Sequence, residues 1–116
     1  MTIICYPACS TCKKAITFLD ARNSEYTYRD IKKDRPNKEE LREFLKRSKL
    51  PLKRFFNTSG QLYRSLNLKD RIQGMDEEEM LDLLSSDGML VKRPILVSGQ
   101  FVLVGFKEKE WEAHLS

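Results

Sequence analysis

The sequence lacks any long hydrophobic run, has a single histidine and contains only three cysteines. No segment approaches the roughly 18 consecutive apolar residues of a membrane-spanning helix, and no repeat or low-complexity tract is visible. No secretory signal opens the sequence, and the cysteines cluster near one end instead of being spread as in an exported disulfide scaffold. We therefore expect a cytoplasmic protein in which residues 1–116 form one domain, large enough to fold without metals or disulfides.

Potential metal ligands are scarce. A structural zinc site usually takes four ligands, and the chain offers no second Cys-x-x-Cys pair beside Cys9 and Cys12, only Cys5 and His114. We therefore expect no metal site. Cys5 lies within a predicted strand and is expected to be an ordinary core residue, while His114 is far in sequence from the cysteines and receives no role.

The formal net charge is +4, and 33% of the residues are charged. This balance suits anionic partners, such as an oxyanion, glutathione or an acidic protein surface. Charges of both signs are interspersed along the chain. We expect no direct contact with nucleic acid or with a membrane.

The most informative motif is the pair Cys9-Ser10-Thr11-Cys12. Residues 1–6 have the pattern of a buried strand, Pro7 marks its exit, and residues 13–22 have the apolar spacing of a helix packed on a sheet. Cys9 is therefore predicted at a helix N-terminus. Unpaired backbone N–H groups and the positive end of the helix dipole favour the thiolate there.

The spacing of the pair indicates redox chemistry. Cys12 lies one helical turn after Cys9 and can attack a mixed disulfide on Cys9, which releases the reduced product and leaves an intramolecular disulfide. Cys9 is thus the predicted nucleophile and Cys12 the predicted resolving thiol, and an external thiol system would restore both. Two buried structural cysteines without chemistry are the alternative.

The rest of the pattern predicts an α/β fold. Residues 25–31 are typical of a second strand, parallel to the first through a helical crossover. Residues 93–97 and 101–104 are predicted to form a hairpin around Ser98-Gly99-Gln100, followed by a helix over residues 107–115.

A polar helical block is predicted between these two units, over about residues 34–90. Asn37 and Asp76 are expected to cap helices that run to about Arg47 and to Ser85. A further short helix is expected around residues 62–66, and Gly88 is expected to end the last helical segment.

Four segments of the chain together resemble the ArsC/Spx family of the thioredoxin-like superfamily. They are Tyr6-Pro7-Ala8-Cys9-Ser10-Thr11-Cys12-Lys13, Asn57-Thr58-Ser59-Gly60-Gln61-Leu62-Tyr63, Lys92-Arg93-Pro94-Ile95-Leu96-Val97 and Val104-Gly105-Phe106. The resemblance covers essentially the whole chain. It implies a thioredoxin/glutaredoxin-like βαβ-ββα mixed sheet with an inserted helical block, and it implies arsenate reductase-like chemistry.

In the arsenate reductases of this family, the cysteine that matches Cys9 attacks arsenate, and glutathione and glutaredoxin resolve the adduct. Arginines hold the oxyanion, and Arg93 stands at one of their positions. The other two positions fall near Asn57 and Phe106, neither of which supplies a cation. Those enzymes also have a histidine at the position of Cys5 and a serine at the position of the resolving thiol.

The missing arginines argue against efficient arsenate reduction, because charge-assisted contacts are worth about 1.5–3 kcal/mol each. The nearby cations that could compensate are Lys53, Arg54, Arg64 and Lys107. The preferred interpretation is a thiol–disulfide oxidoreductase that acts on a small oxidised substrate or a protein disulfide. Its expected reductant is glutathione with glutaredoxin, or thioredoxin.

The predicted substrate or anion site contains Thr11, Arg93, Pro94 and Thr58. The resemblance implies a cis bond before Pro94, beside the nucleophile, against the alternative of an ordinary proline at a strand start. The segment around Thr58 could be a nest of N–H groups for an anion, or a turn that caps the following helix.

Spx-type regulators provide an alternative of a different class. The chain is similar to them in having both cysteines and the Arg93-Pro94-Ile95 unit. Such regulators bind the C-terminal domain of the RNA polymerase α subunit and use the disulfide as a redox switch. The chain departs from them by ending soon after Trp111, without a further basic C-terminal segment.

Overall fold

The alternation of side chains along each strand divides the core into two layers. In β1 (Thr2–Cys5), Ile3 and Cys5 point to one face of the sheet and Ile4 points to the other. The strands β3 (Ile95–Val97) and β4 (Val102–Val104) alternate in the same way. Both faces of the sheet are therefore apolar, and both have to be covered by helices.

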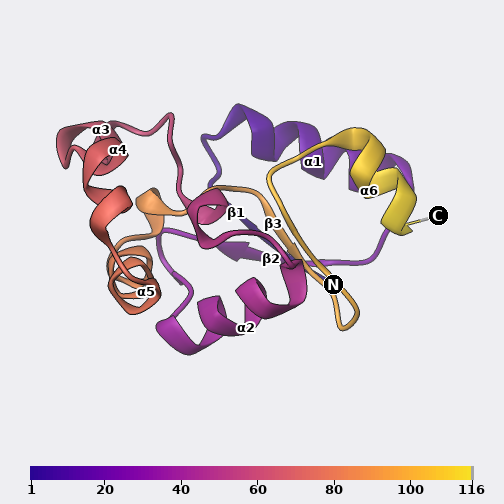
Figure 1. Ribbon diagram of the computed structural model, residues 1–116. Helices are drawn as coiled ribbons and strands as arrows, with labels where there is room; N and C mark the ends of the chain where they lie inside the picture. The colour runs from indigo at the N-terminus through magenta and orange to yellow at the C-terminus, as the bar shows by residue number, and fades with distance from the viewer. Residues whose placement is uncertain (116) are drawn as a thin grey trace.

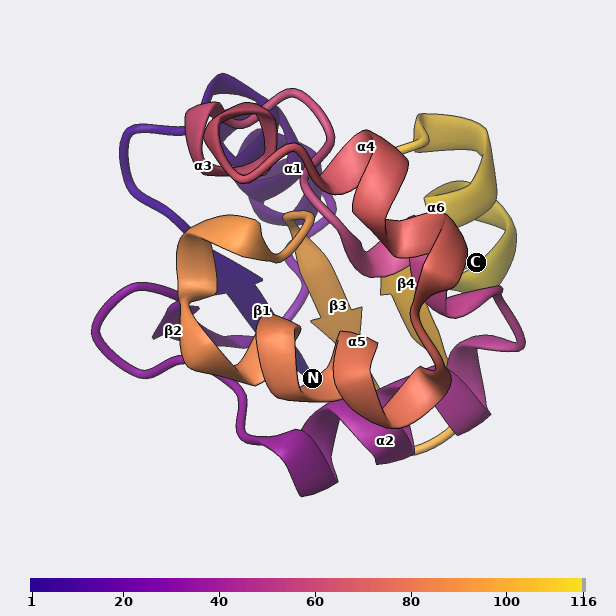
Figure 2. The same cartoon turned by 60° about the vertical axis from the view of Figure 1, so that its left-hand side comes forward.

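The computed structural model describes residues 1–115 as a four-stranded mixed sheet with helices on both faces (Figure 1). The strand order is β2-β1-β3-β4, as Figure 2 shows, where β2 spans Thr27–Asp30. The β1 and β2 strands are parallel, and the β1–β3 and β3–β4 pairs are antiparallel. The predicted crossover and the predicted hairpin are both confirmed.

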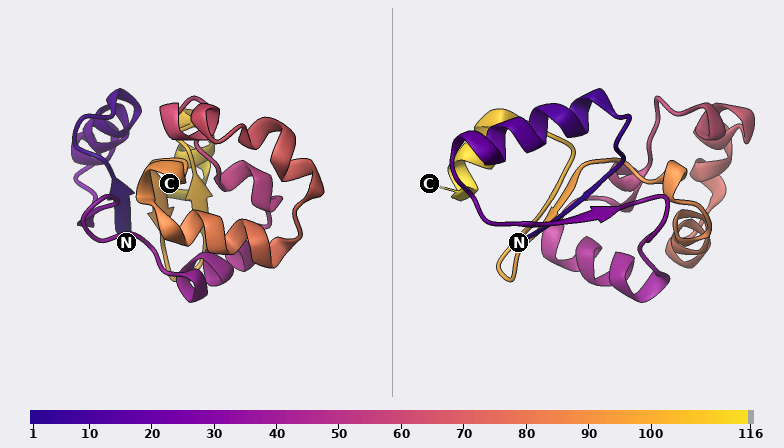
Figure 3. Two further views of the ribbon diagram at one scale, coloured as in Figure 1. Left: turned by 90° about the vertical axis from the view of Figure 1, so that its left-hand side faces the viewer. Right: turned by 180° about the vertical axis from the view of Figure 1, so that it is seen from behind.

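The helices α1 (Ser10–Ala21) and α6 (Glu108–Leu115) lie side by side over the face that contains Cys5 (Figure 3). Phe18 and Trp111 join them through an edge-to-face ring contact, with centroids 6.2 Å apart, and Trp111 is fully buried. The opposite face is covered by α2 (Lys38–Ser48), which contacts β4.

The predicted helical block lies between β2 and β3 in the chain. After α2 it contains α3 (Gln61–Ser65), α4 (Leu68–Arg71) and α5 (Glu77–Ser86), which gather at one end of the sheet in Figure 1. Three short 3₁₀ segments complete it: Leu52–Phe55, Ile72–Gly74 and Gly88–Leu90. The α5 helix packs on α2, so the block extends the second core layer.

Both predicted N-caps are present. The side chain of Asn37 accepts a hydrogen bond from the backbone N–H of Glu40, and the Glu40 carboxylate accepts one from the Asn37 N–H, which completes a capping box. The Asp76 carboxylate accepts a hydrogen bond from the Glu79 N–H. These contacts explain why α2 and α5 begin where the sequence predicts.

One predicted boundary was wrong and two short elements were missed. The α1 helix begins at Ser10, directly after Cys9, and the Lys13 N–H bonds to the Cys9 carbonyl at 3.1 Å. The β2 strand is shorter than residues 25–31, because it pairs only with the four residues of β1. The α4 helix and the 3₁₀ turn at Leu52–Phe55 were not predicted as separate elements.

Gly88 marks a close approach between the helical block and the end of β2. A Cβ atom at this position would lie 2.0 Å from the carbonyl oxygen of Ile31, so only glycine fits without a shift of the backbone. A second glycine, Gly105, follows β4 with a φ of +78°, a conformation that strains other residues. Among the helices of residues 1–115, none has the length and apolar character needed to cross a membrane.

Candidate active site

Cys9 is the N-cap residue of α1. Its backbone is extended, and its N–H closes a turn by donating to the Tyr6 carbonyl oxygen at 3.0 Å. This turn leads the chain directly from the end of β1 into the helix. Cys9 is half-buried, and the first turn of α1 contains no acidic residue. The predicted placement of Cys9 at a helix N-terminus is confirmed.

Cys9 forms part of the wall of a cavity of about 400 Å³, which we call the thiol cavity. Four of its lining residues are cationic, and none of the described residues that line it is acidic. The complete lining is Cys9, Thr11, Arg54, Asn57, Ser59, Gly60, Lys92, Arg93, Val104, Gly105, Phe106 and Lys107. This cavity can attract and hold an anion beside the sulfur of Cys9.

Arg93 is half-buried. Its guanidinium stacks over the ring of Tyr6 at 5.3 Å from the centroid. The Nε and Nη1 atoms are buried and have no hydrogen-bond partner within residues 1–115. Because an unpaired buried charge is costly, an anionic ligand that reached these donors would be bound strongly.

The other cations come from separate segments. Arg54 and Lys107 line the cavity, whereas Lys53 and Arg64, also considered from the sequence, do not. Lys92 lines it as well and was missed, since nothing in its sequence surroundings distinguishes it. Asn57 and Phe106, near which the resemblance placed two arginines of the arsenate reductases, both line the cavity without adding charge.

Thr11 lines the thiol cavity, but Thr58 does not. The segment around Thr58 is a turn closed by a 3.1 Å hydrogen bond from the Gly60 N–H to the Asn57 carbonyl, and Gly60 is the N-cap of α3. The structure therefore supports the alternative in which this segment caps a helix. Of its members, Asn57, Ser59 and Gly60 reach the cavity.

Pro94 is preceded by a cis peptide bond from Arg93, as the resemblance implied. Its carbonyl oxygen accepts a hydrogen bond from the Gly105 N–H at 2.8 Å, and its side chain is buried. This contact holds the segment that carries Arg93 against the segment that carries Phe106 and Lys107. The two walls of the thiol cavity are thereby fixed to each other.

Cys12 lies behind Cys9, at 2% exposure, and does not line the cavity. Its sulfur receives a hydrogen bond from the Tyr6 N–H at 3.5 Å and lies against the thiols of Cys5 and Cys9. The hydrogen bond from Cys5, with that from Tyr6, lowers the pKa of Cys12, and the same Cys5–Cys12 contact raises the pKa of Cys5. Cys5 is a core residue, as predicted, but its contact with Cys12 was not predicted.

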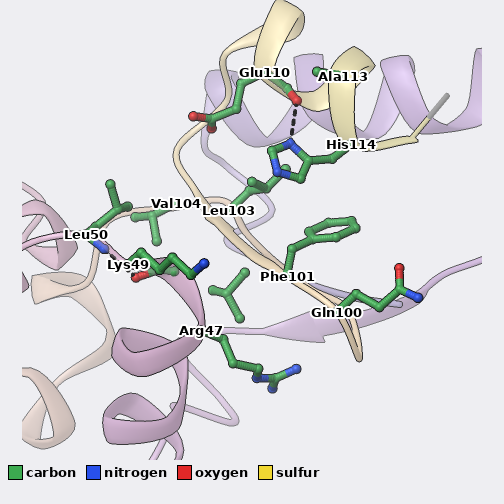
Figure 4. A pocket seen from close by; sticks show the side chains of 12 residues that line it. Arg47, Lys49, Leu50, Gln100, Phe101, Leu103, Val104, Glu110, Ala113 and His114 are labelled. Carbon is green, nitrogen blue, oxygen red and sulfur yellow. Dashed lines mark hydrogen bonds between the residues drawn. The ribbon is translucent and has the colours of Figure 1, made fainter.

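A second cavity, of about 460 Å³, lies between α2, the β3–β4 hairpin and α6, and we call it the histidine cavity (Figure 4). His114 stacks against Phe101 there, with ring centroids 5.0 Å apart, and its Nδ1 lies 2.9 Å from the Glu110 carbonyl oxygen. No cysteine lines this cavity. Elsewhere in the described chain, no cluster of three or more potential ligands could hold a metal ion.

Comparison with known proteins adds to this geometry. The ArsC family pattern matches residues 5–114. The chain is 48% identical over 112 residues to the uncharacterized protein YusI of Bacillus subtilis strain 168. The matched region covers 97% of this chain and 95% of YusI. The chain is 31% identical over 110 residues to the regulatory protein MgsR of the same strain, with coverage of 95% and 86%.

A solved structure shares the fold. The crystal structure of an ArsC family related protein from Bacteroides fragilis superposes with a TM-score of 0.95 at 51% identity, covering 97% of this chain and 94% of that chain. The family pattern and the structural likeness both extend over nearly the whole molecule. The chain therefore belongs to the ArsC family and has its thioredoxin-like fold.

Proposed function

We propose that this protein is a thiol–disulfide oxidoreductase that acts on a small anionic substrate, with Cys9 as the nucleophile and Cys12 as the resolving thiol. The observation that supports this proposal most strongly is the position of Cys9, at a helix N-terminus and in the wall of a cavity with four cations. Cys12 lies directly behind it. The proposed cycle uses no metal or organic cofactor.

In the first step, the thiolate of Cys9 attacks one sulfur of an oxidised disulfide substrate. A bond forms between Cys9 and that sulfur, the substrate disulfide breaks, and the other half leaves as a thiolate. The helix N-terminus favours the attacking anion. Arg93, with buried donors that have no partner within residues 1–115, would hold an anionic group of the substrate beside the reacting sulfur.

In the second step, the thiolate of Cys12 attacks the Cys9 sulfur of the mixed disulfide. The Cys9–Cys12 bond forms and the second half of the substrate leaves as a thiol. The lowered pKa of Cys12 supports this role, because a larger fraction of Cys12 is thiolate at neutral pH. An external dithiol then supplies two electrons and restores both cysteines. Two glutathione molecules can do this only when the substrate is not glutathione disulfide, because that exchange would have no net product.

Glutathione disulfide and glutathione mixed disulfides fit the proposed site in two ways. Their carboxylates can bind the cations of the cavity, and their disulfide bond is the bond that Cys9 would cleave. Arsenate fits by charge alone. It would be reduced to arsenite in the same two steps, with loss of water from the first adduct and with the two electrons of the new disulfide passing to arsenic. The absence of arginine at positions 57 and 106 disfavours arsenate as the main substrate.

The test compares the Cys9→Ser and Cys12→Ser variants with wild type. Reduction of glutathione disulfide and of arsenate is measured by product formation, and the intact mass of each protein is recorded. We expect Cys9→Ser to abolish turnover and adduct formation, and Cys12→Ser to accumulate one covalent glutathione. If Cys12→Ser formed no adduct while Cys9→Ser did, the two roles would be reversed. If both variants kept wild-type turnover, the proposal would be contradicted.

A regulatory function is the second candidate, supported by the similarity to the regulatory protein MgsR. In this case the Cys9–Cys12 disulfide would change the affinity for a partner such as the RNA polymerase α subunit. The experiment is copurification of that subunit with the reduced and the oxidised protein from the native host. Binding that depends on the redox state would support regulation, and absence of binding in both states would exclude this partner.

A further inference from the structure

Three thiols converge where β1 meets α1, although the redox cycle proposed above uses only two. Cys5 is the last residue of β1 and points to the face of the sheet that α1 covers. Cys12 is in the first turn of α1, on the helix face that also buries Ala15 and Leu19. The strand and the helix therefore present these two side chains to each other.

Cys12 lies between the other two thiols. Its sulfur interacts with the side chain of Cys5 and with that of Cys9, and the Tyr6 N–H donates to it at 3.5 Å. Cys5 has no measurable exposure and Cys12 has 2%, whereas Cys9 is half-buried at the cavity wall. The three sulfurs form a short series from the cavity to the core.

We propose that Cys5 is a third redox thiol, which attacks Cys12 in the Cys9–Cys12 disulfide, forms a buried Cys5–Cys12 disulfide and returns Cys9 as a free thiol. This inference rests on the proposed function, because the redox cycle proposed above forms the Cys9–Cys12 disulfide from which the exchange begins. The Cys9–Cys12 bond breaks, the Cys5–Cys12 bond forms, and the proton of Cys5 is transferred to Cys9. One disulfide replaces another, so no further oxidant or reductant is consumed.

The surroundings favour this direction of exchange. Cys9 leaves as a thiolate at the helix N-terminus and beside the cations of the thiol cavity, which stabilise a leaving anion. The contact with Cys12, which is the largest cause of the raised pKa of Cys5, disappears when Cys12 and Cys9 join in a disulfide, whereas burial continues to raise that pKa and the charge of Arg93 to lower it. Cys5 is therefore a better nucleophile toward this disulfide than it is in the reduced protein.

The exchange changes the properties of the oxidised protein. A Cys9–Cys12 disulfide is reached from the cavity through Cys9, but a Cys5–Cys12 disulfide is enclosed in the core and is shielded from external thiols. Cys9 is free again and can react with a second substrate molecule. With excess glutathione disulfide, the wild-type protein should therefore end with one internal disulfide and one glutathione on Cys9.

The experiment uses the wild-type chain and needs no mutation. The protein is oxidised with a limiting amount of glutathione disulfide, quenched in acid, and its free thiols are labelled with an alkylating reagent. Lys13 is the first basic residue, so trypsin releases residues 1–13 as one peptide with all three cysteines. After reduction and labelling of the remaining thiols with a heavy form of the reagent, fragmentation of this peptide locates the light label.

A light label on Cys9 is the expected result, and it identifies the Cys5–Cys12 disulfide. A label on Cys5 would show that the disulfide stays between Cys9 and Cys12, and a label on Cys12 would show a Cys5–Cys9 bond. Either result would overturn this inference and leave the oxidoreductase proposal intact. If every peptide carried three light labels, with no oxidised form, both proposals would be overturned.

The Cys5→Ala variant supplies a second readout, and Cys5→Ser is its matched control for lost volume. With excess glutathione disulfide, we expect both variants to end with a Cys9–Cys12 disulfide and no bound glutathione, unlike the wild type. Circular dichroism checks that each variant is folded. Persistence of one internal disulfide together with one glutathione in a folded variant would contradict the role of Cys5.

Discussion

The thiol cavity and the histidine cavity have similar volumes, about 400 and 460 Å³, but their polar groups are arranged differently. In the thiol cavity, two guanidinium nitrogens of Arg93 are buried without a partner in residues 1–115, and no acidic residue of the described lining offsets the four cations. In the histidine cavity, the Nε atom of Arg47 is also buried without a hydrogen-bond partner in residues 1–115, but it lies 3.4 Å from the Glu43 carboxylate, Nη1 donates to the Ser98 carbonyl, and Glu110 adds negative charge. Unsatisfied charge beside a nucleophile, and not volume, distinguishes the candidate site.

The two cavities also differ in how the chain builds them. The thiol cavity is made where the turn after β1, the cis Arg93–Pro94 bond and the bend at Gly105 come together. The histidine cavity lies beside the edge strand β4, between α2 and α6 (Figure 4). The two walls of the thiol cavity are joined by the backbone hydrogen bond from the Gly105 N–H to the Pro94 carbonyl.

The largest loss of activity is expected when Arg93 of the thiol cavity is changed to Ala. A charge-assisted hydrogen bond is worth about 1.5–3 kcal/mol, which corresponds to a loss of about 10- to 150-fold in kcat/KM for an anionic substrate. The measurement uses glutathione disulfide as the anionic substrate and bis(2-hydroxyethyl) disulfide as a neutral one. We expect a large loss only for the anionic substrate.

The Arg93→Lys variant is the matched control for this experiment. It keeps the charge but loses the planar fork, so its activity should lie between those of Arg93→Ala and wild type. Equal losses for the charged and the neutral disulfide in Arg93→Ala would mean that Arg93 supports the packing against Tyr6 and does not bind an anion.

A gain of about tenfold in arsenate reduction is expected for Asn57→Arg. Asn57 lines the thiol cavity near a position where the resemblance implies an arginine in arsenate reductases, and one new charge-assisted contact is worth about that factor. Phe106 is a poorer position for the change, because its ring packs on Trp111 at 4.9 Å. The Asn57→Gln variant controls for loss of the hydrogen bond from Asn57 to the Met89 carbonyl. If Asn57→Arg reduced arsenate no faster than Asn57→Gln, position 57 would not contact the oxyanion.

A pH experiment tests the buried thiols behind the cavity, in a Cys9→Ser background where Cys5 and Cys12 are the remaining thiols. The contact with Cys5 is the largest cause of the lowered pKa of Cys12, so Cys5→Ala should move the appearance of thiolate absorbance near 240 nm to higher pH. An unchanged midpoint would mean that Cys5 does not donate to Cys12.

The same change should alter how stability depends on pH. Folded Cys12 loses its proton at a lower pH than unfolded Cys12, so its contribution to the free energy of unfolding rises with pH between the two pKa values and is lost as the pH falls through the folded one. Urea unfolding below pH 8 measures this slope before the raised pKa of Cys5 acts in the opposite direction. Cys5→Ala should flatten it.

Much of the fold was predictable because the signals are local. Alternation in β1, the capping residues Asn37 and Asp76, and the turn between β3 and β4 each depend on a few adjacent residues. The short α4 helix was not predictable in the same way, because a single turn has no apolar period to detect. Only its packing, through the fully buried Leu68, holds it in place.

The candidate site was predictable in its chemistry but not in its full composition. The proximity of Cys9, Thr11 and Arg93 could be predicted, because the Cys-x-x-Cys motif and the Arg-Pro unit belong to a recognisable family pattern. Lys92 was missed because its place in the cavity depends on the bend at Gly105, whose missing side chain leaves room for the lysine. Likewise, sequence spacing alone does not show that Cys5 meets Cys12 across the strand and the helix.

The smallest effect is expected for His114→Ala in the histidine cavity. His114 is exposed and its main contacts are one ring and one carbonyl of its own helix, so stability should change by no more than about 0.5 kcal/mol and kcat/KM by no more than about twofold. Thermal unfolding and the glutathione disulfide assay measure the two values, with Phe101→Leu as the matched change on the other side of the ring contact. A loss of activity in His114→Ala comparable to that of Arg93→Ala would show that both cavities take part in turnover, and the contrast between them would no longer identify the site.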